Sequence, residues 1–311
     1  MNKTDTEEPT ISVIIPTYNR KKLLIRAIQS VIDQTVSPEE LIIVDDKSEF
    51  DVEKYLDKKI NCSFKLKIII NPSNFGGAKS RNIGVKNASG KYVAFLDSDD
   101  YWHEKKIELI KKKLKIKDID LIYSDQWIVK ENGKLKESNK VLIDNNLWEN
   151  LLNGWTAPNT STLVFARDKL LEIGGFNSNL KSCQDHDLWM KVAQNNLDLE
   201  FIEKRLSYFT RDADNRISFN IEKRISGAIS FLENWRKEII ETRNKKFYKK
   251  FKNKYIFKVL FPIFIKQIKN FNLFKAIKLY LKYFKFDLFF YKQMLKNFFD
   301  LDFDFFKDRL Y

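Results

Sequence analysis

The sequence has little cysteine and histidine, with two of each among 311 residues. Cys62 and Cys183 are too few for a disulfide framework, and no group of Cys and His has the spacing of zinc ligands. Residues 1–9 are polar and carry acids, unlike a secretory signal peptide. These absences predict a protein of the reducing cytosol.

Long apolar runs are also missing from the phenylalanine-rich end of the chain. In residues 243–311 the longest run, 259–265, has seven residues and contains Pro262. A membrane-spanning helix needs about 20 apolar residues, so we expect this region not to cross a bilayer. The whole sequence is nevertheless 43% hydrophobic, which is enough to bury a substantial core.

The net charge of +14 is concentrated in the same region. Residues 243–311 hold eighteen Lys or Arg against five Asp or Glu, whereas residues 1–242 hold 38 against 37. We therefore predict two regions, one over 1–242 and a basic, aromatic, helical C-terminal region over 243–311. Four lysines share one helical face beside apolar neighbours: Lys275, Lys278, Lys282 and Lys285.

This region has two interpretations. A basic amphipathic helix can lie on an anionic membrane surface, and we expect this partner because the charge excess is so concentrated. Alternatively, the aromatic side chains pack on residues 1–242 or on a second subunit and leave the lysines in solvent. Residues 300–308 alternate acids with Phe and fit a membrane face poorly.

Residues 1–100 alternate apolar strands with amphipathic helices. Strands are predicted at 11–15, 41–44, 67–70 and 92–96, and helices at 22–34, 52–58 and 77–87. This alternation predicts an α/β fold with a Rossmann-like, mostly parallel sheet covered by helices on both faces. The later pattern predicts a hairpin around 132–133, helices at 147–154 and 187–195, a strand at 160–166 and a turn at 174–177.

Acidic residues follow the strands at the edge where such sheets bind ligands. Asp97, Asp99 and Asp100 come directly after the strand at 92–96. Because three carboxylates this close repel one another, they suit a hard divalent cation with oxygen ligands. The alternative is that they cap a helix beginning near His103.

Three further features have both a functional and a structural interpretation. Asp46 can accept hydrogen bonds from a base or ribose, or cap a helix. Gly76 and Gly77 precede a helix whose N-terminus favours anions, with Arg81 near its first turn, or they form an ordinary tight turn. Asp185 stands just before a predicted helix, as a general base or a cap.

These motifs together resemble the family 2 glycosyltransferases, which have the GT-A fold. The matching segments are 12–20, 43–48, 74–84, 95–100, 174–176 and 184–189. The resemblance covers roughly residues 10–220. It implies that residues 1–242 form the catalytic domain of an inverting enzyme in which Asp185 is the catalytic base.

The resemblance also implies the donor site. Mg²⁺ or Mn²⁺ would be held by Asp97, Asp99 and Asp100, with Asp99 as the direct ligand. Residues expected to contact the nucleotide sugar, most often a uridine diphosphate sugar, are Pro16, Tyr18, Arg20, Asp46, Gly76, Arg81, Asp97, Ser98, Arg211 and Arg216. Gln184 replaces the usual glutamate, and a processive Gln-x-x-x-Arg-Trp motif is absent, which implies transfer of one sugar per event.

We expect a nucleotide-sugar donor and a lipid-linked glycan acceptor of bacterial surface polysaccharide, lipooligosaccharide or glycoprotein-glycan assembly, at the cytoplasmic face of the inner membrane. A nucleotidyltransferase would need a glycine-rich signature that residues 16–20 lack. A nucleic-acid-binding protein would leave the acidic strand ends unexplained, and nucleic acid is not an expected partner. A catalytically inactive sugar-nucleotide-binding relative remains an alternative because of Gln184.

Overall fold

The computed structural model describes residues 8–57, 59–130, 132–138, 146–154, 157–210 and 221–269, with the backbone alone at 221 and 262–269. By its internal contacts the chain divides into two compact units. Unit 1 comprises residues 1–148, 157–179 and 184–215. Unit 2 comprises 149–156, 180–183 and 216–311.

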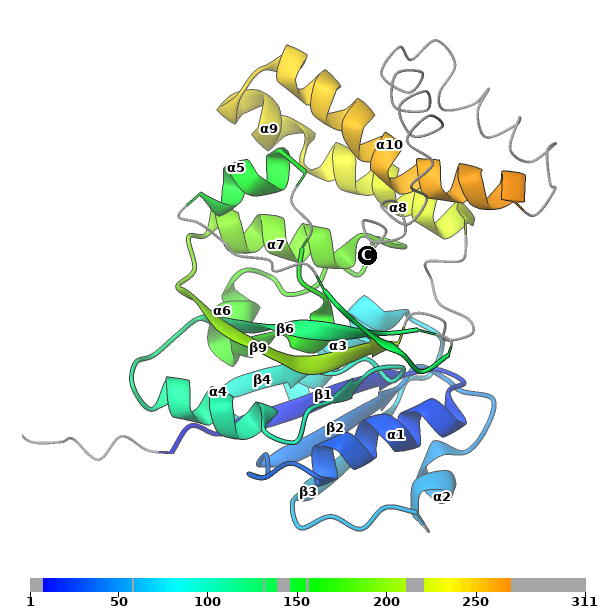
Figure 1. Cartoon of the computed structure of the whole chain (residues 1–311), viewed down its shortest axis with the longest axis vertical. Helices are drawn as coiled ribbons and strands as arrows, with labels where there is room; N and C mark the ends of the chain where they lie inside the picture. Colours follow the sequence, from blue (N-terminus) through cyan, green and yellow to red (C-terminus); the bar gives the residue numbers. More distant parts are fainter. Residues whose placement is uncertain are drawn as a thin grey trace, which may run out of the picture. The chain divides into compact units, whose positions relative to one another are not determined.

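Four parallel strands form the first half of the sheet in unit 1 (Figure 1). In spatial order they are β3 (Lys65–Ile70), β2 (Glu40–Asp45), β1 (Ile11–Thr17) and β4 (Tyr92–Phe95). The crossover helices are α1 (Lys21–Ile32), α2 (Val52–Asp57) and α3 (Gly77–Asn87). Every strand and helix predicted before residue 100 is confirmed, because the apolar runs of β1, β2 and β4 are fully buried.

The second half of the sheet mixes antiparallel and parallel pairs. Beyond β4 the order continues β8 (Val164–Ala166), β6 (Leu121–Val129), β9 (Leu199–Thr210) and β5 (Tyr101–Trp102). β7 (Leu135–Glu137) pairs antiparallel with β6 and confirms the predicted hairpin. The fold is that of an α/β protein whose sheet is parallel from β3 to β4, as expected.

Three differences from the predicted boundaries concern the segments around the acidic residues and Asp185. Residues 160–162 form a 3₁₀ turn, so only 164–166 of the predicted strand pair in the sheet. α7 (Gln184–Gln194) starts earlier than predicted and carries Asp185 in its first turn. The helix after the acidic segment, α4 (Lys106–Leu114), starts later, because Tyr101 and Trp102 pair with β9 instead. The carboxylates at 97–100 therefore do not cap that helix.

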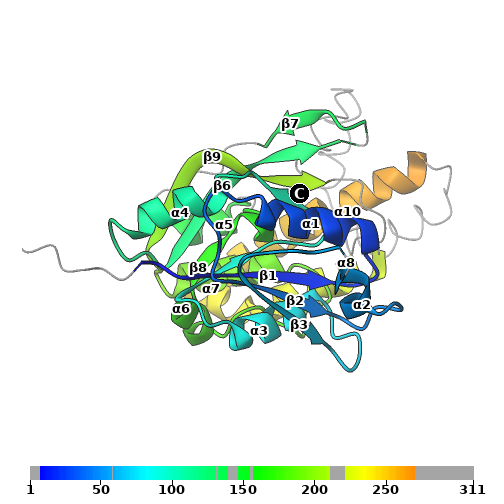
Figure 2. The ribbon, with the colours of Figure 1, turned by 90° about the horizontal axis from the view of Figure 1, so that it is seen from below.

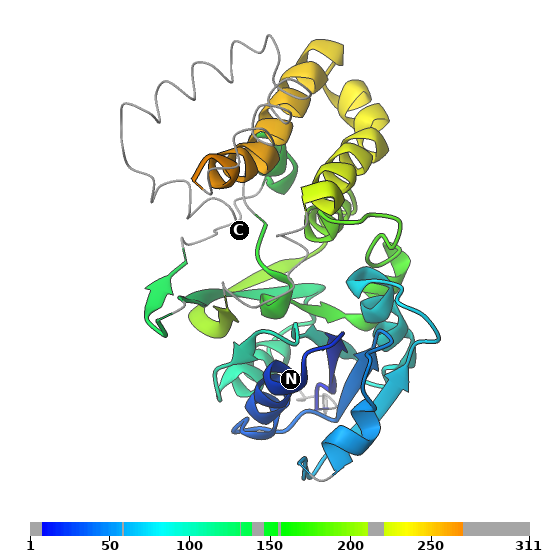
Figure 3. The same ribbon diagram turned by 90° about the vertical axis from the view of Figure 1, so that its right-hand side faces the viewer.

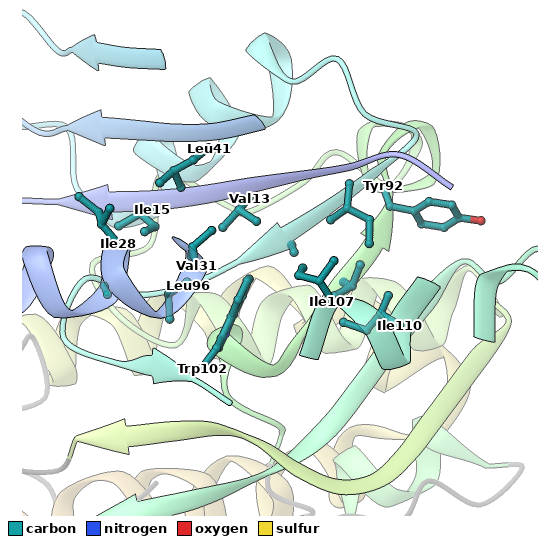
Figure 4. Packing of buried hydrophobic residues seen from close by; sticks show 14 of the residues in the cluster. Val13, Ile15, Ile28, Val31, Leu41, Tyr92, Leu96, Trp102, Ile107 and Ile110 are labelled. Carbon is teal, nitrogen blue, oxygen red and sulfur yellow. The ribbon is translucent and has the colours of Figure 1, made fainter. Parts of the chain in front are cut away.

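The two faces of β1 meet different helices. Ile11, Val13 and Ile15 point to one face and belong to a fully buried cluster with residues of α1 and α4 (Figure 4). Ile14 points to the other face and lies against Gly84 of α3. Figure 2 shows α1 and α4 on one side of the sheet, with α3 and α6 (Arg167–Glu172) on the other. Helices on both faces thus hold the ends of the parallel strands in place.

The regular secondary structure described in unit 2 is helical. α8 (Ile221–Asn234) and α10 (Lys245–Lys269) pack together and α9 (Arg236–Thr242) joins them; α5 (Leu147–Leu152) ends within the segment 149–156 of this unit (Figure 3). The Tyr255 ring of α10 stacks on Phe231 of α8 with centroids 4.8 Å apart. The boundary predicted between 242 and 243 falls between α9 and α10.

Most of the described aromatic side chains of α10 are buried. Phe251, Tyr255, Phe257 and Phe261 are buried, whereas Lys245, Lys246, Lys249, Lys250 and Lys254 are exposed. This stretch therefore combines buried aromatic side chains with solvent-exposed lysines. Lys275, Lys278, Lys282 and Lys285 lie outside the described residues. Within the described part of the chain, no helix has the length and apolar character needed to traverse a bilayer.

Candidate active site

An acidic cluster lies just past the end of β4. Asp97, Asp99 and Asp100 offer carboxylate oxygens that all lie within 4.8 Å of one another. Asp99 is 9% exposed and Asp100 is fully buried, so water screens these charges poorly. Close oxygen ligands of this kind fit a hard divalent cation.

Arginines neutralise the cluster from two helices. The Arg20 Nη1, at the start of α1, lies 3.0 Å from the Asp99 Oδ2, and Arg81 of α3 forms an ion pair with Asp97. The Arg26 Nη2 of α1 donates to the Asp99 carbonyl oxygen at 2.6 Å and to the Thr210 Oγ1 at 2.7 Å. The Arg26 guanidinium also lies over the Tyr101 ring, 4.6 Å from its centroid.

The sequence predicted a site role for Arg20 and Arg81 but missed Arg26. Arg26 belongs to none of the matching motifs, and it reaches the cluster only because α1 folds back beside β5. A basic residue on the largely buried face of an amphipathic helix was the only available signal.

Asp100 joins three separate segments of the chain through hydrogen bonds. Its carboxylate accepts hydrogen bonds from the Ser161 Oγ at 2.7 Å and from the Thr210 N–H at 3.0 Å. The Ser161 Oγ also accepts the Asp97 N–H at 3.1 Å. Asp100 and Ser161 therefore fix the acidic segment against the 3₁₀ turn and the end of β9.

Lys106 lies beneath this network and was also missed. Its Nζ donates to the Thr162 carbonyl oxygen at 3.3 Å and to the Ser207 Oγ at 3.2 Å. The Ser207 Oγ in turn donates to the Ser161 carbonyl oxygen at 2.9 Å. Burial lowers the pKa of Lys106 to about 7. A lysine in a basic helix gives no sequence signal of burial.

Asp46 holds the loop before α3 and does not cap a helix. Its carboxylate accepts the N–H groups of Phe75 at 2.8 Å and Gly76 at 2.7 Å, together with the Asn71 Nδ2 at 2.9 Å. Gly76 has φ of 87°, a conformation that glycine adopts without steric cost. The loop that was expected to approach a phosphate is thus shaped by a buried carboxylate.

The other predicted donor-site residues lie around the same edge. Pro16 is buried in β1, whereas Tyr18, just after β1, is 44% exposed. Ser98 is buried within the acidic segment. Arg211 and Arg216 lie outside the described residues.

The turn at 174–176 follows α6 in the chain and contacts side chains of β4, α3 and α7. The Phe176 ring lies 5.1 Å from that of Phe95, and the Arg81 guanidinium lies over it at 5.3 Å. From α7, the Lys191 Nζ donates to the Gly175 carbonyl oxygen at 2.8 Å.

Asp185, in the first turn of α7, is partly exposed. The buried Asp187 faces Lys191 instead, at 3.5 Å.

Residues 12–169 match the sequence model of Glycosyl transferase family 2. The chain belongs to the family 2 glycosyltransferases. The matched segment contains β1 to β8, the acidic cluster and all three arginines that contact it.

Relatives and solved structures agree with this assignment. An uncharacterized glycosyltransferase of Rickettsia bellii is 33% identical over 236 residues, 74% of this chain and 33% of that protein. The chain thus spans about a third of the length of that relative. The Escherichia coli protein WfgD, a UDP-Glc:alpha-D-GlcNAc-diphosphoundecaprenol beta-1,3-glucosyltransferase, is 30% identical over 193 residues, 60% of this chain and 70% of that protein.

The fold is the GT-A fold seen in S. aureus TarS. The structure of TarS 1–349 in complex with UDP-GlcNAc has a TM-score of 0.63 and 23% sequence identity, covering 80% of this chain and 72% of that one. At this identity the likeness concerns the fold.

Proposed function

We propose that this glycosyltransferase moves one sugar from a uridine diphosphate sugar to a hydroxyl group of a glycan acceptor, with inversion at the anomeric carbon. The observation that carries the proposal is the cluster of three carboxylates and three arginines at the end of β4, within the segment that matches the family. WfgD is named for a UDP-Glc donor and TarS was solved with UDP-GlcNAc, which supports a uridine nucleotide.

The chemistry divides between the acidic cluster and α7. Asp97 and Asp99 would hold Mg²⁺ or Mn²⁺, with Asp100 beside them. A divalent cation held there would supply positive charge that offsets the charge developing on the leaving group. Pro16, Tyr18 and Asp46 would line the nucleotide pocket, and Arg20, Arg81 and the backbone at Gly76 and Ser98 would face the phosphates. Arg211 and Arg216 would add further positive charge.

Asp185 would act as the general base. Its carboxylate takes the proton of the acceptor hydroxyl as that oxygen forms a bond to the anomeric carbon. The bond from this carbon to the diphosphate oxygen breaks on the opposite face, and the nucleoside diphosphate leaves with the bonding electron pair. A single displacement of this kind inverts the configuration.

The acceptor we propose is a lipid-linked glycan, since WfgD is named for a sugar on diphosphoundecaprenol. The catalytic role belongs to residues 1–242, and residues 243–311 would bind the anionic cytoplasmic face of the inner membrane. Because the α10 aromatics are buried, the exposed lysines of α10 would make this contact electrostatically.

Calorimetry tests the donor assignment. UDP, GDP and their sugars are titrated with and without Mn²⁺ into wild type, Asp99→Ala and the control Asp118→Ala, which removes an exposed carboxylate paired with Lys91. Micromolar, Mn²⁺-dependent binding of one nucleotide, lost only in Asp99→Ala, supports the proposal. Absence of nucleotide binding by the folded wild type contradicts it. Binding without any transfer to lipid-linked acceptors would favour the inactive relative.

A further inference from the structure

Three arginine side chains of the protein itself contact the acidic cluster. The side chains of Arg20 and Asp99 are each only 12% exposed, and the Arg20 Nη1 lies 3.0 Å from the Asp99 Oδ2. Arg81 and Asp97 form a second pair, and Arg26 binds the Asp99 carbonyl oxygen. The three carboxylates of the cluster are thus matched by three guanidinium groups.

This balance disfavours a divalent cation that enters alone. A free cation must displace a guanidinium from its carboxylate and leave that guanidinium poorly solvated near a second positive charge. A divalent cation and the diphosphate of a nucleotide sugar carry opposite charges of equal size. Together they preserve the charge balance, and the phosphate oxygens offer a new partner to the displaced arginine.

Arg20 is the arginine best placed to move. Arg26 is held by the Asp99 carbonyl, the Thr210 hydroxyl and the Tyr101 ring. Arg81 is held by Asp97 and lies over the Phe176 ring. Among the described residues, the contact of the Arg20 side chain is with Asp99, and Arg20 precedes the first turn of α1.

We propose that Arg20 serves as an exchangeable counterion, which occupies Asp99 in the donor-free enzyme and passes to the diphosphate when the divalent cation takes Asp99. Each of the two ligands, metal and nucleotide, therefore strongly increases the affinity of the enzyme for the other. Arg20 accounts for much of this increase. The inference rests on the proposed function, because it assumes that the acidic cluster receives a metal–diphosphate unit.

Electron paramagnetic resonance of free Mn²⁺ tests the exchange without any activity measurement. Mn²⁺ is titrated into the full-length wild type with and without saturating UDP, and UDP is expected to tighten Mn²⁺ binding by at least tenfold. Arg20→Gln removes the internal competitor. In this variant the affinity for Mn²⁺ alone should rise about tenfold, and the factor by which UDP tightens Mn²⁺ binding should fall correspondingly.

Lys21→Gln is the matched control. It removes the same charge from the neighbouring residue, whose Nζ lies over the Phe50 ring at 4.7 Å. This variant should bind Mn²⁺ as the wild type does. Circular dichroism confirms that both variants are folded, and Asp99→Ala identifies the Mn²⁺ signal that belongs to the cluster.

The two proposals fail in different ways. If folded wild type binds no UDP in the presence of Mn²⁺, the proposed function is wrong. If UDP and Mn²⁺ bind together but Arg20→Gln binds Mn²⁺ alone no better than the wild type or Lys21→Gln, the exchange is wrong and the proposed function stands.

Discussion

The side chain of Asn82 binds both backbone groups of Phe176. Its Nδ2 donates to the Phe176 carbonyl oxygen at 2.7 Å, and its Oδ1 accepts the Phe176 N–H at 3.0 Å. Asn82 follows Arg81, which pairs with Asp97. One turn of α3 thus contacts both the acidic cluster and the segment that leads into α7, which carries the proposed base.

We expect Asn82→Ala to weaken the fold and slow catalysis together. Loss of two partly buried hydrogen bonds should lower the free energy of unfolding by about 1–3 kcal/mol, measured by urea denaturation. Because the proposed base follows the segment that Asn82 holds, kcat should fall more than the KM for the donor rises.

Asn87→Ala is the control for this prediction. Asn87 lies on the same helix, is exposed, and bonds the Ile83 carbonyl oxygen and Lys67. It should leave both quantities nearly unchanged. Equal effects of the two substitutions on stability and kcat would refute a specific role for Asn82.

The sequence predicted best what depends on local pattern. The strands before residue 100 are continuous apolar runs, so their positions and the acidic residues at their ends were evident. What the acidic residues bind within the protein depends on contacts between distant segments. The pairing of Asp99 with Arg20 and of Asp100 with Ser161 joins residues 79 and 61 positions apart. The sequence predicted no strand at Tyr101 and Trp102, because their partner strand, β9, lies about a hundred residues later.

Lys106 should make stability depend on pH. Its pKa is about 7 in the folded protein and 10.5 ordinarily, so between these values the unfolded chain binds the extra proton. Stability therefore rises with pH across this window, by up to about 1.4 kcal/mol per pH unit from this group. In Lys106→Met this contribution disappears. The stability of the wild type relative to Lys106→Met should increase by roughly 2 kcal/mol between pH 7 and pH 9.

Chemical denaturation of both proteins at several pH values measures this difference. Tyrosines with raised pKa values, such as Tyr92 and Tyr101, are present in both proteins and cancel in the comparison. A difference that stays constant from pH 7 to pH 9 would show that Lys106 keeps its proton in the fold.

Substitution of Asp185 should affect catalysis, whereas substitution of Asp187 should affect stability. Asp185→Asn removes the proposed base from a partly exposed position, so kcat should fall by at least about 100-fold while Mn²⁺-dependent UDP binding and stability persist. Asp187→Asn alters a buried carboxylate that faces Lys191, so it should lower the melting temperature. Kinetics, calorimetry and thermal unfolding distinguish the two variants. Near-normal kcat in Asp185→Asn would remove this residue from the mechanism.

The close packing of α3 on β1 should require glycine at position 84, beside Ile14. A Cβ added at Gly84 would lie 2.4 Å from the Ile14 Cγ2, and Ile14 is fully buried. Gly84→Ala gains about 1 kcal/mol of helix propensity but forces overpacking that costs about 1–3 kcal/mol. We expect a net loss of stability, measured by urea denaturation.

A double-mutant cycle separates these two effects of Gly84→Ala. In an Ile14→Ala background the space beside residue 84 is vacant, so the added methyl group no longer clashes. There, Gly84→Ala should stabilise the protein through helix propensity and partial filling of the cavity. The same substitution should thus change sign between the two backgrounds. If it destabilises both equally, the close approach of α3 to β1 is not what requires glycine at this position, and a backbone constraint within α3 must account for it.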